Sequence, residues 1–78
     1  MLTWTEAVTD AVRRVAAKSS DGVFTRHDLD SQEGARMVAE TGTSGETPMQ
    51  TVSRELQQLR NAGIIEFVDN RGTYKLIN

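Results

Sequence analysis

The stretch "TPMQTVSRELQQLRNAGIIEF", residues 47–67, constrains the fold of this chain more than any other. Thr47 has the position of a helix N-cap, Pro48 fits the first helical position, and Gln50 completes a capping box. Gly63 stands where a glycine usually ends a helix. A β-prone run follows it directly. The stretch therefore predicts a well-delimited helix that leads into a strand.

The two faces of this predicted helix differ sharply. At 100° per residue the apolar stripe consists of Met49, Val52, Leu56, Leu59 and Gly63. The opposite pole carries Gln50, Arg54, Gln57 and Asn61, with Thr51 and Gln58 beside them. Glu55 lies on the flank, so the pole has no carboxylate. Amides suit the edge of adenine and a guanidinium suits guanine, so this face favours DNA contact. An ordinary solvated helix face is the alternative interpretation.

The chain before this helix predicts two further helices and a short strand. The first helix lies in "TWTEAVTDAVRRVAAKSSDG", where Thr3 and Glu6 have the spacing of a capping box. Its apolar residues recur at helical spacing: Trp4, Val8, Ala11, Val12 and Val15. "VFT", residues 23–25, predicts a strand. Thr25 and Asp28 then predict a second helix from Arg26, with Leu29, Met37 and Val38 as its apolar residues and Gly34 weakening its middle. Residues 41–46 predict a loop.

The last fifteen residues, "IIEFVDNRGTYKLIN", predict a β-hairpin. Ile65 and Phe67 share one face of its first strand, and Tyr74 and Leu76 share one face of its second. "DNRG" supplies the turn, because Asn70 and Gly72 tolerate positive φ. A lone hairpin is marginal in water, so it must pack on the helices or pair with "VFT". The predicted fold is an α+β winged helix-turn-helix over residues 1–78, with three helices, one short strand and a C-terminal hairpin wing.

Composition narrows the class of function. The 78 residues carry a net charge of −2 and contain no cysteine, which excludes disulfides, thiol catalysis and cysteine-based zinc sites. An acidic chain is poorly suited to binding nucleic acid without sequence specificity, since the affinity of such binding comes from neutralising phosphates. The acid is concentrated early: residues 1–47 hold five basic and eight acidic groups (−3), whereas residues 48–78 hold four and three (+1). With neither a signal peptide nor a membrane-length apolar run, we expect a cytoplasmic protein.

No set of residues predicts catalysis. His27 is the only histidine, and Ser44 has no local base. Asp28, Asp30 and Glu33 are nearby acids on a helix without a nuclease motif. "RR" at 13–14 lies among acids and predicts a solvated face. We therefore expect no enzyme, no metal and no cofactor.

Several of these segments resemble known winged-helix proteins. "TVSRELQQLRNAGII" is similar to the recognition helix and wing entry of winged-helix transcription repressors. "VFTRHDLD" together with "TVSRELQQLRNAGIIEFVDNRGTYKL" resembles the C-terminal winged-helix domain of Dam-replacing type II restriction endonucleases. That resemblance is carried by Leu56, Gln57, Leu59, Arg60 and residues 63–67, 71–72 and 74–76. It implies sequence-specific binding of duplex DNA, with cleavage performed by a separate nuclease domain.

The predicted partner is double-stranded DNA, bound by a stand-alone transcription regulator or by the DNA-binding module of a larger protein. The candidates for base contacts are Gln50, Thr51, Arg54 and Gln57. The candidates for phosphate or groove-edge contacts are Ser53, Gln58, Arg71 and Lys75. The alternative is a winged-helix module that binds a protein without binding DNA, its acidic first half facing a basic partner. A homodimer through the first helix is also open.

Overall fold

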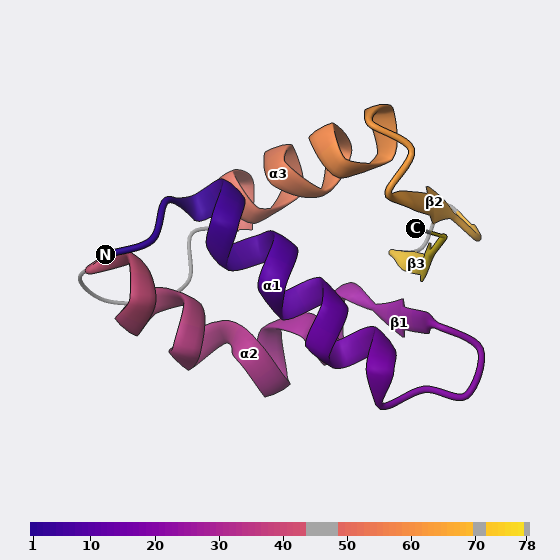
Figure 1. Ribbon diagram of the computed structural model, residues 1–78, viewed down its shortest axis with the longest axis horizontal. Coiled ribbons are helices and arrows are strands. Elements are labelled where there is room, and N and C mark those ends of the chain that lie inside the picture. The colour runs from indigo at the N-terminus through magenta and orange to yellow at the C-terminus, as the bar shows by residue number, and fades with distance from the viewer. Residues whose placement is uncertain (44–48, 70–71, 78) are drawn as a thin grey trace.

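The computed structural model describes residues 1–43, 49–69 and 72–77, and for Met49 the backbone only. These residues form a small α+β domain with three helices and a three-stranded antiparallel sheet (Figure 1). In chain order the elements are α1 (Trp4–Ala17), β1 (Val23–Thr25), α2 (Arg26–Thr41), α3 (Met49–Asn61), β2 (Ile65–Phe67) and β3 (Thr73–Leu76). The order is the one predicted, and it is compatible with a winged-helix-like layout.

Two helices begin at the capping boxes that the sequence predicts. Thr3 Oγ1 accepts a hydrogen bond from the Glu6 amide (3.1 Å), and Glu6 Oε1 accepts one from the Thr3 amide (3.0 Å). Thr25 and Asp28 exchange the equivalent bonds at 2.9 and 3.2 Å. Each box satisfies amides that a helix end leaves without a partner. The box predicted on Thr47 and Pro48 lies outside the described residues.

The second helix is more regular than expected. It runs without a break through Gly34, which is buried, and ends at Gly42, whose φ of 70° is the left-handed conformation typical of a helix C-terminus. Leu29 and Met37 are buried and Val38 is half-buried. Burial against the rest of the domain thus outweighs the weak helix propensity of a glycine.

Helix α1 is central to the hydrophobic core, because it packs against both other helices and the sheet. Its apolar face is buried, as predicted: Val8, Ala11, Val12 and Val15. The predicted stripe of α3 is buried at Val52, Leu56 and Leu59, whereas Gly63 follows the helix and is exposed. Trp4 lies half-buried at the edge of this core and donates its indole N–H to Thr43 Oγ1 (3.1 Å).

The sheet has the strand order β1-β3-β2, so β3 lies in its centre. "VFT" does pair with the hairpin: Phe24 stands opposite Tyr74, and Phe67 stands opposite Tyr74 from the other side. The ring of Tyr74 lies 5.5 Å from that of Phe24 and 5.1 Å from that of Phe67. Phe24 and Tyr74 belong to the core, whereas Phe67 is exposed at the edge of this aromatic row.

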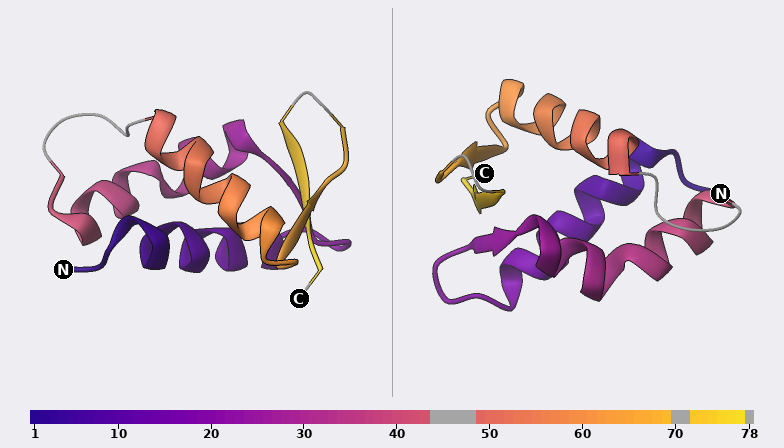
Figure 2. Two further views of the ribbon diagram at one scale, coloured as in Figure 1. Left: turned by 90° about the horizontal axis from the view of Figure 1, so that it is seen from above. Right: turned by 180° about the vertical axis from the view of Figure 1, so that it is seen from behind.

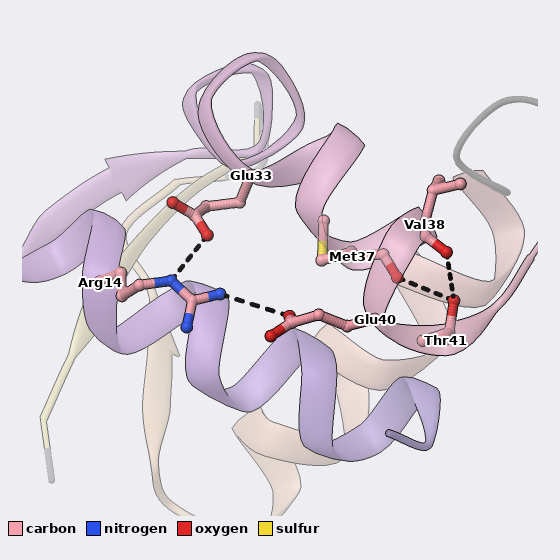
Figure 3. A network of polar contacts seen from close by, with 6 residues as sticks. All are labelled: Arg14, Glu33, Met37, Val38, Glu40 and Thr41. Carbon is pink, nitrogen blue, oxygen red and sulfur yellow. Dashed lines mark hydrogen bonds and ion pairs between the residues drawn. The ribbon is translucent and has the colours of Figure 1, made fainter. Parts of the chain in front are cut away.

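Two charged residues lie elsewhere than the sequence predicted. Arg14, predicted on a solvated face, is half-buried and pairs through Nε with Glu33 Oε1 at 2.7 Å (Figure 3). Glu33, predicted among surface acids, is only 5% exposed. A second carboxylate, that of Glu40, lies 3.7 Å from Arg14 Nη2. The guanidinium therefore joins α1 to α2, and its charge lets an acid sit inside their interface.

Within the described ranges, no helix is long and apolar enough to cross a membrane.

Candidate nucleic-acid interface

The outward face of α3 carries the polar residues that the helical periodicity predicts. Its exposed members are Gln50, Arg54, Gln57, Gln58 and Asn61. Thr51 and Ser53 are half-buried on its margins. Across the described part of the chain, Arg54 has no ion pair or hydrogen bond. The face therefore offers amide groups and one unengaged guanidinium to a partner.

The single acid of α3, Glu55, does not belong to this face. Its side chain is turned into the interface with α1, and only 4% of the residue is exposed. The hydroxyl of Thr5, in the first turn of α1, donates a hydrogen bond to Glu55 Oε1, and Oε2 lies 3.2 Å from the same hydroxyl. The positive end of the α1 dipole lies at this turn and favours a carboxylate there. Glu55, predicted on the flank of α3, is thus withdrawn from solvent.

The second arginine of α3 is held by an aromatic ring. The guanidinium carbon of Arg60 lies 4.7 Å from the ring centroid of Phe67. Such a contact attracts the cation to the face of the ring. It joins the last turn of α3 to β2.

Lys75, a predicted phosphate contact, is half-buried in the central strand, where it stands between Val23 and Glu66. Asp21 is another acidic neighbour. The Ser19 hydroxyl and the Val23 amide hold the pKa of Asp21 below its usual range, and the charge of Lys75 adds to this effect. Lys75 therefore has acidic surroundings that Arg54 lacks. Its contact with DNA stays a prediction.

Three parts of the chain face the same side of the molecule. Seen from above, the N-terminal ends of α2 and α3, the end of β2 and the start of β3 lie on one side, and α1 lies along the other side (Figure 2, left). The backbone connects two of them, because the Arg26 amide donates to the Gly72 carbonyl (2.8 Å). Arg71, the predicted wing-tip contact, lies outside the described residues, but its neighbour Gly72 lies beside the start of α2.

The first turn of α2 is a part of this side that the sequence did not assign to a site. It contains Arg26, which is half-buried, and the exposed His27. In the sequence, the Thr25 cap predicts where α2 starts. It does not predict which other elements lie beside that start. The structure thus places the first turn of α2 beside the start of β3, where the Arg26 amide bonds to the Gly72 carbonyl.

No group of three or more potential metal ligands occurs among the described residues. No known family, curated protein or solved structure matches the chain. The resemblance to winged-helix repressors and to the restriction-enzyme domain stays a prediction.

Proposed function

We propose that this chain is a winged helix-turn-helix domain that binds duplex DNA, with α3 in the major groove and the β2–β3 hairpin as a second contact. It acts without a catalytic step, as a cytoplasmic regulator of transcription or as the DNA-binding module of a larger protein. The support is the order of helices and strands, the β1-β3-β2 sheet, and the side that α2, α3 and the hairpin share.

The burial of Glu55 carries this proposal. A carboxylate about 8 Å from a phosphate, at an effective dielectric constant near 20, costs about 2 kcal/mol. One specific base contact is worth roughly 1–3 kcal/mol, so a single exposed acid would cancel it. The structure turns the only acid of α3 towards Thr5 and leaves Arg54 exposed. This arrangement suits an anionic partner.

The decisive experiment is a titration of labelled duplex DNA with the purified chain, followed by fluorescence anisotropy at several salt concentrations. We expect binding at low salt. With about three phosphate contacts, affinity should fall about 40-fold between 50 and 200 mM salt. If the protein binds no duplex at the lowest salt, where phosphate attraction is strongest, the proposal is wrong.

Two variants separate base contacts from phosphate contacts. Arg54→Ala should weaken specific binding by roughly 1–3 kcal/mol if Arg54 contacts a base. Arg71→Ala should weaken binding to all sequences and reduce the salt slope by about one unit. Arg13→Ala, an exposed arginine on α1, is the matched control and should change neither quantity. Equal losses in all three variants would show that only net charge matters.

A protein-binding module is the second candidate. It is favoured by exposed apolar side chains near the hairpin, where Phe67 is 39%, Val68 52% and Ile77 49% exposed. Apolar exposure of this kind often marks contact with another protein. Failure of DNA binding together with loss of a protein contact in Val68→Ser or Ile77→Ser would favour this candidate.

A further inference from the structure

The outward face of α3 is rich in one chemical group, the carboxamide. Gln50, Gln57, Gln58 and Asn61 are all exposed on it. In the major groove a carboxamide can donate to N7 of adenine and accept from its N6 amino group at the same time. No other base presents this pair of an acceptor and a donor on one edge. Three of these carboxamides, Gln50, Gln57 and Asn61, lie at the centre of the face and therefore favour adenine over the other bases.

Thr51 adds to the same preference. It is half-buried, beside the amide-bearing residues. A threonine methyl group makes an apolar contact with the C5-methyl group of thymine, which cytosine lacks. The thymine of an A·T pair is thus recognised by a different residue from the adenine, and both contacts come from the first turns of α3.

One side chain on this face favours guanine instead. Arg54 is exposed, has no partner within the described ranges, and suits the O6 and N7 acceptors of guanine. The other arginine of α3, Arg60, lies against the Phe67 ring. Arg54 stands between Gln50 on one side and Gln57 on the other. A guanine that it contacts is therefore flanked by bases that face amides.

The length of the face sets the length of the site. From Gln50 to Asn61 a helix rises about 16 Å, at 1.5 Å per residue. Because base pairs in B-DNA are 3.4 Å apart, a helix of this length lies beside about five of them. The six side chains on the face therefore suffice for one short core sequence.

We propose that the target is duplex DNA with a core of about five base pairs that is A·T-rich and contains one internal G·C pair. This inference rests on the proposed function and adds the class of sequence. Gln50, Gln57 and Asn61 contact adenines, Thr51 contacts a thymine methyl group, and Arg54 contacts the guanine. Affinity for such a core exceeds that for a G·C-rich core of equal length and charge.

Selection from a randomised duplex library, followed by titration of the selected duplexes, tests this inference. We expect an A·T-rich core with one conserved G·C pair, bound about 5- to 150-fold more tightly for each matched base contact. Binding with no base preference, or selection of G·C-rich cores, overturns this inference and leaves the proposed function intact. Absence of binding to every duplex overturns both.

Variants assign the positions. Arg54→Gln replaces the guanidinium by an amide, so selection should lose the single G·C pair and keep the A·T pairs. Gln57→Ala should relax the preference at one A·T position. Gln32→Ala is the control, because Gln32 is exposed on α2, where it accepts a bond from Lys18 Nζ (3.2 Å). An unchanged G·C position in Arg54→Gln would overturn the assignment of that base pair to Arg54.

Discussion

The two interfaces of α1, one with α2 and one with α3, each contain a buried acid, but they neutralise it differently. Glu33 in the α1–α2 interface pairs with the guanidinium of Arg14. Glu55 in the α1–α3 interface receives a hydrogen bond from the Thr5 hydroxyl and has no ion pair among the described residues. One interface therefore uses a cation, and the other uses a neutral donor and the end of a helix dipole.

The difference matters for the surface that remains. An arginine that neutralises a buried acid is no longer available to a partner, as Arg14 illustrates. Glu55 is held by a hydroxyl instead, and Arg54, next to it in sequence but on the outward face, is exposed. The α1–α2 interface thus engages an arginine within the fold, whereas the α1–α3 interface withdraws an acid from the face of α3.

The apolar packing of the two interfaces should be equally important. Leu56 of α3 is 1% exposed and Met37 of α2 is 0% exposed. We expect Leu56→Ala and Met37→Ala each to lower the free energy of unfolding by roughly 2–5 kcal/mol, because each leaves a cavity. Urea unfolding followed by circular dichroism measures this. In so small a domain either loss could unfold much of the population. If both variants unfold at the same urea concentration as the wild type, the described core is wrong.

Removal of the cation should cost more than removal of the hydroxyl. Arg14→Ala leaves Glu33 buried without a positive partner, and we expect a loss of roughly 3 kcal/mol, the lower end for a broken buried pair because Arg14 is partly exposed. Replacing both residues by leucine should recover part of this loss, since Glu33 is then gone, whereas the Glu40 carboxylate still loses its cation. A double-mutant cycle in thermal unfolding measures the coupling. Additive effects would contradict the pairing.

The Thr5 hydroxyl should have a smaller effect on stability and an additional effect on binding. Thr5→Val keeps the shape but leaves the Glu55 carboxylate without its donor, at a cost of roughly 1–3 kcal/mol. We also expect weaker DNA binding, because Glu55 then gains by turning towards water. Thr5→Ser restores the hydroxyl and should recover both properties. If Thr5→Val binds DNA as tightly as the wild type, the hydroxyl does not control the charge of this face.

The smallest expected effect on stability concerns Glu6, an exposed acid in the first turn of α1. The Thr3 amide and the Thr3 hydroxyl hold the pKa of Glu6 below its usual range. Because the folded-state pKa is lowered, this stabilisation is present above the pKa of the unfolded chain and is lost as the pH falls through the folded-state value. Glu6→Gln should therefore have a lower melting temperature than the wild type near pH 7, and the difference should be smaller near pH 3. Asp10→Asn, on the same helix, is the control.

Local patterns in the sequence predict much of this fold. Both described capping boxes, the apolar face of α1 and the buried residues of α3 follow from spacing alone, because each depends on residues three or four positions apart. The instability of a lone hairpin left two alternatives, packing on the helices or pairing with "VFT", and the structure shows the pairing. The exposed amides of α3 followed from the same periodicity.

The partners of charged residues were harder to predict, because they lie far apart in sequence. Arg14 and Glu33 are 19 positions apart, and Thr5 and Glu55 are 50. A weaker signal was present in both cases. Glu33 stands four residues from both Leu29 and Met37, and Glu55 lies only about 60° from Val52 on the helix, so both acids border an apolar stripe. Periodicity thus indicates that an acid is buried but not which residue neutralises it.

The central place of β3 has a consequence for the time at which the sheet forms. Strands β1 and β2 do not pair with each other, and residues paired between β1 and β3 are separated by about 50 positions. Closing so long a loop costs entropy before any pairing repays it, so β1 has no strand partner until residues 73–76 arrive. During synthesis, we expect the three helices to associate first and the sheet to assemble last, which leaves the edge of β1 that will pair with β3 open to other chains until β3 is in place.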